Sequence, residues 1–507
     1  MSYDAVIIGS GLGGLSCGSY LATRGWKVLV LEKHSIAGGY ASSFKRGDFT
    51  FDASLHMLNG VAKGERWYKF FEWCGIADRI EFQKLNYFGR VVFPEHDFRI
   101  PCSGLEDVIS TFEKHFPHEK AGIRNLFTEM GKIYEDQISF SASEKPLWIK
   151  LALFPFLYRS LFPVVKKTSS ELLDKHIKDE RLKAIFYANW IFYGLPPSRL
   201  NITYGVLPNL SFWRLGAYYP KGGNQVIPNA FVDVIKENGG EVIFNHEVSK
   251  IITEGRKAVG VETRKGKSFK GNVIISNISP HDTFLRLLEP EIIPDKIKDS
   301  ISKMELSGSH FLVYLGLGVE FTNRLENKED YEFFISNTYD HDLDYQWSIS
   351  GEFEKASYEL VLYSNADKTI SKGNKFIMGL TQFHSYDYWQ KFENDYLAGN
   401  KEKYKQEKER VANMLVKRAE QIIPNISQYI EVIEIATPLT FKRFTSNPKG
   451  ASYGWANLVT QSNPLQRSPQ KTPIKNLYLS SAWTFPGEGQ TATVRCGYGL
   501  GKTLVGK

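Results

Sequence analysis

A short glycine-rich turn near the start of the chain contains the residues best suited to chemistry. Residues 9–14 read GSGLGG. In a strand-turn-helix, Gly9 suits the tight turn, Gly11 lets the backbone approach a pyrophosphate, and Gly14 permits close helix-strand packing. Gly13 belongs to the same turn, and the N–H groups of the following helix favour negative charge. The turn therefore predicts a dinucleotide-binding site.

The elements around this turn have the pattern of a βαβ unit. Residues 3–8 and 27–31 are short apolar runs typical of buried strands, and residues 15–23 have helical spacing. Glu32 ends the second strand about 20 residues after the turn, where a carboxylate can accept hydrogen bonds from ribose hydroxyls. This second signal makes a dinucleotide site much more probable than an incidental glycine turn.

Further α/β pieces occur in the middle and at the end of the chain. We expect a helix at 225–238, strands at 241–244, 248–253, 258–263, 272–276 and 476–480, and a terminal helix from Thr491. At 507 residues the chain exceeds one usual hydrophobic core. We therefore predict an FAD- or NAD-binding domain assembled from residues 1–70, 215–285 and 470–507. Residues 71–214 and 286–469 would form a substrate-binding region.

Composition excludes several classes of function. The net charge of +7 is spread over 63 basic and 56 acidic residues, without a basic block interleaved with aromatics, so nucleic acid is not an expected partner. None of the four cysteines forms a CxxC motif, and neither clustered Cys/His ligands nor a nucleophile elbow is visible, so we predict no metal site and no hydrolase. The start MSYDAVIIGSG lacks a secretory pattern, so reducing cytoplasm is the expected compartment.

Four separated motifs distinguish FAD from NAD. Residues 32–43 (EKHSIAGGYASS) resemble the extended motif of the flavin amine oxidase and phytoene desaturase superfamily, although Tyr40 stands where an Arg is frequent. Residues 47–56 (GDFTFDASLH) look like a loop of retinol saturases and carotenoid isomerases. Residues 219–224 (YPKGGN) and 479–489 (LSSAWTFPGEG) resemble two later flavin motifs. The chain thus resembles the FAD-dependent retinol saturase, carotenoid isomerase and phytoene desaturase group.

The resemblance implies an α/β fold with a Rossmann-type FAD-binding domain, as in two-dinucleotide-binding-domain flavoproteins, and a discontinuous α+β substrate domain. It implies FAD as the cofactor. No second glycine motif is evident for NAD(P)H, so a transient nicotinamide and a separate reductase are equal alternatives as electron donor. The FAD-binding residues predicted from the turn and the resemblance are Gly9, Gly11, Gly13, Gly14, Glu32, Lys33, Gly38, Gly39, Ala41, Ser42, His56, Val248, Ala482, Trp483, Gly489, Thr491 and Ala492.

A flavin enzyme of this group would saturate, desaturate or isomerise a carbon-carbon double bond in a long hydrophobic substrate. His56 is the candidate catalytic acid or base, and its alternative role is a structural histidine that orders the flavin loop. Tyr218, Tyr219 and Lys221 are weaker candidates. A flavin amine oxidase or an FAD-binding lipid carrier without catalysis would share the same motifs, so both remain alternatives.

One apolar segment suggests contact with a membrane. Residues 147–165 (LWIKLALFPFLYRSLFPVV) are followed by Lys166 and Lys167. An apolar, aromatic stretch with basic flanks can lie in a bilayer interface, and a pair of buried short helices is the equal alternative. We therefore predict a possible membrane-contacting segment at 147–167, in a protein that is otherwise cytoplasmic. The sequence leaves the oligomeric state open.

Overall fold

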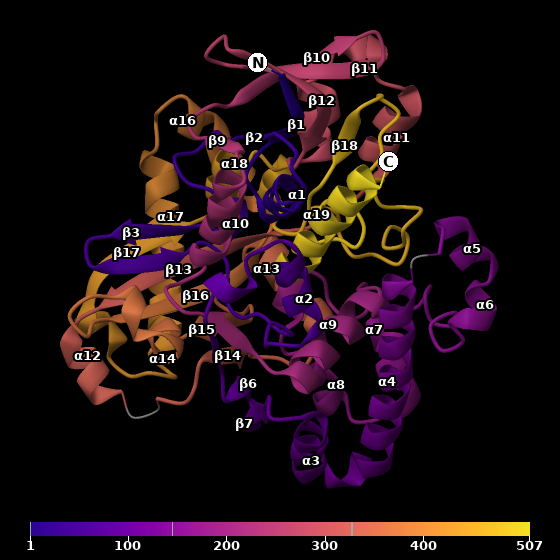
Figure 1. The fold of residues 1–507 in the computed structure, drawn as a ribbon. Coiled ribbons are helices and arrows are strands. Elements are labelled where there is room, and N and C mark those ends of the chain that lie inside the picture. Colours follow the sequence, from indigo (N-terminus) through magenta and orange to yellow (C-terminus); the bar gives the residue numbers. More distant parts are fainter. Residues whose placement is uncertain (1, 144, 326–327, 507) are drawn as a thin grey trace.

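Two large mixed sheets and a group of helices make up the fold (Figure 1). The computed structural model describes residues 2–143, 145–325 and 328–506. In the view of Figure 1 the first sheet lies at the top, the second at the lower left and a group of helices that includes α4 at the lower right. Segments from both chain ends and from the middle meet in the first sheet, which is the one that contains the glycine turn.

The first sheet has seven strands in the order β10-β11-β12-β1-β2-β9, with β18 paired to β12. The pairs of β1 with β12 and β2, β2 with β9, and β12 with β18 are parallel, whereas β10, β11 and β12 are joined antiparallel. The strands are β1 (Ser2–Ile8), β2 (Val28–Leu31), β9 (Glu241–Ile243), β10 (Val248–Glu254), β11 (Lys257–Thr263), β12 (Ser268–Ser276) and β18 (Leu477–Leu479). This parallel core, with its glycine turn after β1, confirms the predicted Rossmann-type α/β fold.

Helix α1 (Leu12–Ala22) lies beside this sheet and packs against both α10 (Val226–Glu237) and α19 (Gln490–Val505). Every residue of α1 is buried, because its small side chains let α19 approach closely. A Cβ atom added at Gly497 would lie 2.2 Å from the Gly13 carbonyl oxygen. The first helix begins at Leu12, three residues earlier than expected, since Gly11 is its N-cap. The strand expected at 272–276 also begins earlier, at Ser268.

The second sheet also has seven strands, in the order β17-β13-β16-β15-β14-β6-β7. All of its pairs are antiparallel except β14 with β6. The strands are β6 (Tyr87–Phe93), β7 (His96–Pro101), β13 (Ser309–Leu317), β14 (Glu332–Ile335), β15 (Tyr358–Val361), β16 (Phe376–His384) and β17 (Ile430–Ala436). The four middle strands, β13 to β16, are buried along their whole length, so this sheet is covered on both faces.

Two small two-stranded sheets and the remaining helices complete the fold. The small sheets pair β3 (Ser43–Arg46) with β4 (Phe49–Asp52), and β5 (Phe82–Lys84) with β8 (Tyr218–Pro220). The helices at the lower right of Figure 1 include α2 (Arg66–Trp73), α3 (Leu105–His115), α4 (Lys120–Ala142), α7 (Ser169–His176), α8 (Glu180–Phe186) and α9 (Ile202–Leu215). The others are α11 (Asp295–Lys303), α12 (Val319–Arg324), α13 (His341–Ser350), α14 (Tyr363–Ala366), α15 (Tyr386–Trp389), α16 (Glu393–Leu397), α17 (Glu402–Ala419) and α18 (Pro438–Thr445).

The apolar segment forms two short helices, α5 (Leu147–Ala152) and α6 (Phe154–Leu157), which project at the right edge of Figure 1. Neither helix contains a buried residue, so the alternative of a buried helix pair is wrong. Trp148 is 71% exposed and Phe156 is 69% exposed. Among the described residues, every helix is too short or too polar to cross a bilayer.

Candidate functional site

The glycine turn has the geometry that a pyrophosphate cradle requires. Gly9 follows β1 with φ +88°, a conformation that favours glycine. A Cβ atom at Gly13 would lie 2.5 Å from the Ser480 carbonyl oxygen, and one at Gly14 would lie 2.8 Å from the Gly9 carbonyl oxygen. Glycine is therefore needed where the turn meets both the helix and the end of β18. The N-cap residue Gly11 has no side chain, and the Gly14 N–H donates to Asn277 Oδ1 at 2.8 Å, which leaves the N–H groups of Leu12 and Gly13 to face an anion.

Glu32 is buried at the end of β2 and held by three hydrogen bonds. Its Oε2 atom accepts bonds from the backbone N–H of Ser10 at 2.8 Å and from the Ser10 hydroxyl at 2.6 Å. Its Oε1 atom accepts a bond from the His34 N–H at 2.9 Å. A carboxylate has about four acceptor positions, so one remains for a ribose hydroxyl. The carboxylate is thus fixed in place beside the turn.

The loop after Glu32 folds back onto the glycine turn. Gly38 has φ +125° and pairs with Gly11, and the Gly38 N–H donates to the Ser10 carbonyl oxygen at 2.9 Å. Lys33 donates from Nζ to the Ser446 hydroxyl at 2.7 Å, and burial lowers the pKa of its ammonium group. The Tyr40 hydroxyl donates to the Ala451 carbonyl oxygen at 3.1 Å. The loop is therefore anchored both to the turn and to the segment after α18.

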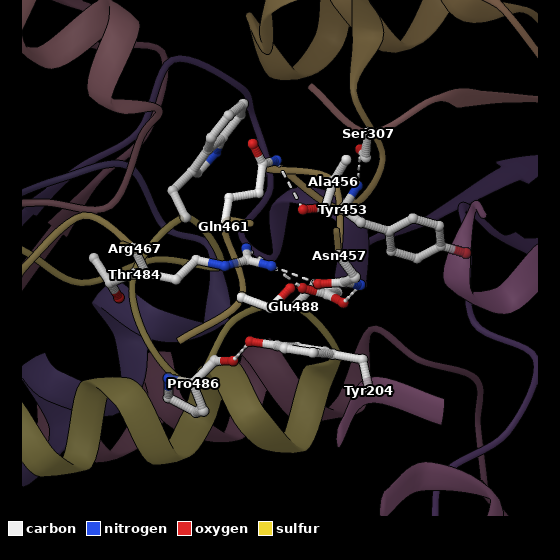
Figure 2. Close-up of polar contacts among 12 residues, drawn as sticks. Tyr204, Ser307, Tyr453, Ala456, Asn457, Gln461, Arg467, Thr484, Pro486 and Glu488 are labelled. Carbon is white, nitrogen blue, oxygen red and sulfur yellow. Dashed lines mark hydrogen bonds and ion pairs between the residues drawn. The ribbon is translucent and has the colours of Figure 1, made fainter. Parts of the chain in front are cut away.

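The amino terminus of α19 forms the opposite wall. Gly489 is the N-cap of this helix, and no side chain caps its first N–H groups. Trp483 is buried against Trp455, with ring centroids 4.9 Å apart. The Tyr204 hydroxyl of α9 donates to the Pro486 carbonyl oxygen at 2.5 Å, which ties the loop to the helical region (Figure 2). The start of α19 can therefore present N–H groups to a ligand.

A buried polar network holds the same loop, as Figure 2 shows. Arg467 is 2% exposed, and its guanidinium lies 3.8 Å from the Glu488 carboxylate. The Asn457 amide bridges them, since its Oδ1 accepts from Arg467 and its Nδ2 donates to Glu488. Burial raises the pKa of Glu488 despite the nearby guanidinium. Sequence reasoning missed Arg467 and Asn457, because no local pattern marks an arginine in a loop as buried.

All of these walls enclose one cavity of about 790 Å³. It extends from the glycine turn past the start of α19 to an apolar end lined by residues that include Leu151, Phe154, Leu161 and Leu207. The sequence-predicted residues that line it are Gly9, Gly11, Glu32, Lys33, Gly38, Gly39, Ala41, His56, Val248, Ala482, Trp483, Gly489, Thr491 and Ala492. Gly13, Gly14 and Ser42 do not line it: the two glycines serve helix packing, and the Ser42 hydroxyl donates to the Gly39 carbonyl oxygen at 2.8 Å.

His56 lies at the wall of the cavity in a cluster with two buried glutamates. Its Nδ1 atom is 3.1 Å from Glu332 Oε1 and 3.8 Å from Glu359 Oε2. Its Nε2 atom is 3.3 Å from the Thr381 hydroxyl. Burial lowers the pKa of His56, although Glu359 opposes this, and burial raises the pKa of both carboxyls well above the usual range. The cluster therefore favours neutral groups and can hold or transfer protons.

Sequence reasoning missed Glu332 and Glu359, although a signal existed. Each stands in a short run that is otherwise apolar, EFFI in β14 and YELV in β15. A carboxyl group in a strand that is buried on both faces cannot be solvated by water, so we expect it to be paired or to have a function. The register places Glu359 of β15 opposite Phe334 of β14 and Thr381 of β16, so these side chains lie on one face of the sheet. Glu332 is two residues from Phe334 on β14, so it lies on that face too.

The weaker candidates have structural surroundings. The Tyr219 hydroxyl donates to Asp52 Oδ2 at 2.5 Å in the core, and Lys221 forms an exposed ion pair with Glu81. Among the residues that line the cavity, Tyr218, Tyr219 and Lys221 are absent. Asp52 also accepts from the Ser43 hydroxyl and the Asn224 N–H, so it joins the loop after Gly39 to the YPKGGN segment.

Comparison with known proteins agrees with this geometry. The family described as flavin containing amine oxidoreductase matches residues 12–370, more than half of the chain. A chloroplastic prolycopene isomerase 1 from an Oncidium hybrid cultivar is 26% identical, covering 98% of this chain and 82% of its own length. An all-trans-retinol 13,14-reductase from Danio rerio is 25% identical, covering 94% and 82%.

A solved structure shows the same fold. Cyclohexylamine oxidase from Brevibacterium oxydans superposes with a TM-score of 0.59 at 14% identity, covering 100% of each chain. A glycine turn, a fixed carboxylate and an uncapped helix start are what a bound flavin dinucleotide requires, so the residues present fit the cofactor. The chain therefore belongs to the flavin containing amine oxidoreductase family and is an FAD-dependent enzyme.

Proposed function

We propose that this enzyme acts on carbon-carbon double bonds of a long hydrophobic substrate, a carotenoid, a retinoid or another polyene or lipid. The reaction class is saturation, desaturation or cis-trans isomerisation. The observation that carries this proposal is the continuity of the cavity, which joins the dinucleotide cradle directly to an apolar end. The names of the relatives, a prolycopene isomerase and a retinol reductase, support the same substrate class.

The FAD site in this proposal consists of the cavity-lining residues around the glycine turn and the start of α19. Glu32 would accept from the ribose, the start of α1 would receive the pyrophosphate, and the N–H groups near Thr491 and Ala492 would face the flavin ring. A bound flavin supplies or accepts a hydride. The residues of the chain orient the cofactor, exclude water from the apolar end and, at His56, hold a proton near the substrate.

The division of the chain follows from the same proposal. Residues 1–70, 215–285 and 470–507 would form the FAD-binding domain, because the strands of the first sheet come from these segments. Residues 71–214 and 286–469 would form the substrate domain, which contains the second sheet and α5 and α6. NAD(P)H is proposed only as a transient electron donor, and a separate reductase would serve equally.

Flavin spectra test the proposed reaction. The oxidised enzyme is reduced anaerobically with dithionite, or with NADPH in a parallel sample, and then mixed with a panel of polyenes and unsaturated lipids. We expect a polyene either to reoxidise the flavin, which identifies a saturase, or to change its isomer composition without reoxidation, which identifies an isomerase. An oxidised flavin that is bleached by a saturated substrate would identify a desaturase.

Two other outcomes would contradict the proposal. Bleaching of the oxidised flavin by amines, with no response to any polyene, would favour an amine oxidase. A flavin that resists dithionite would favour a lipid carrier in which FAD is only structural. Free FAD with the same polyenes is the control for reactions that need no protein.

We also propose that α5 and α6 rest on a membrane surface at the entrance of the cavity. Leu151 and Phe154 from these helices line the cavity, while Trp148 and Phe156 face outward. Along the chain, Lys150, Arg159 and the pair Lys166-Lys167 lie within or directly after the apolar segment. Apolar rings with basic flanks suit the interface of an anionic bilayer, and a polyene could pass from the bilayer into the cavity.

Liposome co-sedimentation tests the membrane contact. Trp148→Ser combined with Phe156→Ser should lower the membrane-bound fraction at least about tenfold, because burying each aromatic side chain contributes about 1.5–3 kcal/mol. Leu397→Ser is the matched control, since Leu397 is 74% exposed on α16, far along the chain from this segment. Equal binding of both variants, or no binding of the parent protein to anionic vesicles, would exclude a membrane role for α5 and α6.

A further inference from the structure

Among the residues that the structure describes, no lysine or arginine supplies a counter-charge to the buried cluster of His56, Glu332 and Glu359. Within the described part of the chain, the ion pairs of both glutamates involve His56 alone. Glu332 is fully buried, and Glu359 is 1% exposed. The Oε2 atom of Glu332 and both carboxyl oxygens of Glu359 lack any hydrogen-bond partner. Two carboxylates without cations in such a site would be strongly unfavourable, so something else must neutralise them.

The spacing of the cluster is compatible with a metal ion as well as with protons, because one ligand atom from each of the three residues lies within 4.8 Å of the others. The hydrogen-bond contacts of His56 favour protons. The 3.1 Å separation of His56 Nδ1 from Glu332 Oε1 is that of a hydrogen bond. The second imidazole nitrogen is near the Thr381 hydroxyl. Both nitrogens of His56 are therefore engaged as hydrogen-bonding atoms.

The surrounding titratable groups are neutral. Tyr363 and Tyr331 lie beside the cluster, and burial raises the pKa of both phenols well above the usual range. Burial has the same effect on Tyr453, which faces Glu359. His310, which faces His56, has a pKa lowered by burial to about 4. None of these groups can supply a positive charge at neutral pH, so the two carboxyl groups must carry their own protons.

We propose that Glu332 and Glu359 are a buried proton store that supplies the substrate end of the cavity through His56. This inference rests on the proposed reaction at a double bond. Glu332 does not line the cavity, whereas His56, Glu359 and Thr381 do, so His56 stands between Glu332 and the substrate. Glu332 is thus a positioning and proton-holding residue, and His56 is the group that touches substrate.

The proton path balances for saturation of a double bond. A reduced flavin would supply a hydride for one new C–H bond, and the electron pair of the broken π bond would form the second with a proton from His56 Nε2. Glu332 returns a proton to His56 Nδ1 across the 3.1 Å hydrogen bond. The imidazole ends as its other neutral tautomer, and Glu332 ends as a carboxylate that solvent or Glu359 reprotonates. The cluster carries a net negative charge only from the moment Glu332 gives up its proton until it is reprotonated.

Infrared spectroscopy tests the store without any substrate. In the holoenzyme at pH 8 we expect the C=O stretch of protonated carboxyl groups, shifted in D₂O, because both carboxyl pKa values are raised by burial. Glu332→Gln and Glu359→Gln should each remove part of this signal. Glu434→Gln is the matched control: it lies on the same sheet but is 36% exposed and pairs with Arg46, so it should change nothing.

Kinetics and stability provide the second readout. In Glu332→Gln, single-turnover flavin reoxidation by a polyene should slow about 100-fold, the lower range for a general acid, and Glu332→Asp should recover part of it. The parent rate should fall as pH rises through the raised carboxyl pKa. The stability of the parent protein should fall as pH rises from the ordinary glutamate pKa of 4.5 through the raised pKa of the folded state, because over that range the folded state keeps a proton that the unfolded state has lost. Glu332→Gln should lack the part of this decline that Glu332 causes.

The remaining outcomes of these experiments distinguish a failure of the proton store from a failure of the proposed function. Absence of the protonated carboxyl signal in the parent holoenzyme, together with about one bound Mn²⁺ or Zn²⁺ per chain, would identify a metal site. Absence of both would show ionised carboxylates. If polyenes do not react but Glu332→Gln and Glu359→Gln each remove part of the infrared signal, the proposed function fails and the proton store does not. If polyenes react and Glu332→Gln keeps the parent rate and pH profile, the store alone is wrong.

Discussion

Gly14→Ala is expected to weaken flavin retention by about 10- to 100-fold, equivalent to about 1.4–2.7 kcal/mol. The added methyl group would lie 2.8 Å from the Gly9 carbonyl oxygen, 2.9 Å from Asn277 Cβ and 3.0 Å from Ile7 Cγ2. Because it meets atoms on three sides, α1 must move away from β1, and its N–H groups would leave the pyrophosphate position. The measurement is the ratio of flavin absorbance to protein after gel filtration, followed by titration with FAD.

Gly499→Ala provides a matched control for this substitution. Gly499 also lies in a helix and has no neighbouring atom within 4 Å of an added Cβ. Alanine there should retain flavin fully and raise stability by about 0.5–1 kcal/mol, because glycine is unfavourable inside helices. If Gly14→Ala bound FAD as tightly as Gly499→Ala does, the packing role that the sequence and the structure both assign to Gly14 would be wrong.

The dinucleotide half of the molecule could be predicted from sequence because its signals are local. Residues 9–14 and Glu32 are joined by one strand and one helix, so their separation along the chain fixes their separation in space. The expected strands of the first sheet are all present, and their ends differ by at most four residues. The expected helix from residue 491 begins at Gln490. Short-range sequence patterns were therefore sufficient to predict the elements of this part of the fold.

The cluster of His56, Glu332 and Glu359 could not be predicted in the same way. Glu332 is 276 residues from His56, and the pairing of β14 and β15 that brings the two glutamates together depends on the register of a sheet with one parallel pair. Sequence periodicity identifies a buried strand but not its neighbour. Only His56 was named, and it was named by resemblance. The burial of a glutamate in an apolar run was the signal that could have identified the others.

The apolar segment at residues 147–165 illustrates a different limit of prediction from sequence. Its composition allowed both a buried helix pair and an exposed one, and hydrophobicity alone does not distinguish them. The structure leaves α5 and α6 without a buried residue, while Tyr158, Leu161 and Val164 just beyond them are buried. Tertiary packing against α4 determines which part of the segment is buried, because Asp136 of α4 accepts hydrogen bonds from the N–H groups of Ser160 and Leu161.

Arg467→Met is expected to reduce the free energy of unfolding by about 3–5 kcal/mol, because it removes one member of a buried ion pair whose two side chains are linked by hydrogen bonds through Asn457. The guanidinium donates to Asn457, which in turn donates to Glu488, so the change also releases the loop before α19. Flavin retention should fall with stability, since Glu488 and Gly489 line the cavity. Chemical unfolding of the holoenzyme and of the flavin-free protein would separate the two effects.

Two further variants decide whether the ion pair is the cause. Arg46→Met breaks an exposed pair with Glu434 and should cost less than about 1 kcal/mol, as surface pairs do. Glu488→Gln introduced into Arg467→Met should restore part of the stability, because an amide in place of the carboxyl leaves no buried charge to compensate. If the double variant were no more stable than Arg467→Met, the loss would arise from packing of the arginine side chain against the Tyr204 ring and not from its charge. Van der Waals packing would then stabilise the loop before α19, and the hydrogen bonds of Asn457 would contribute little to the free energy of unfolding.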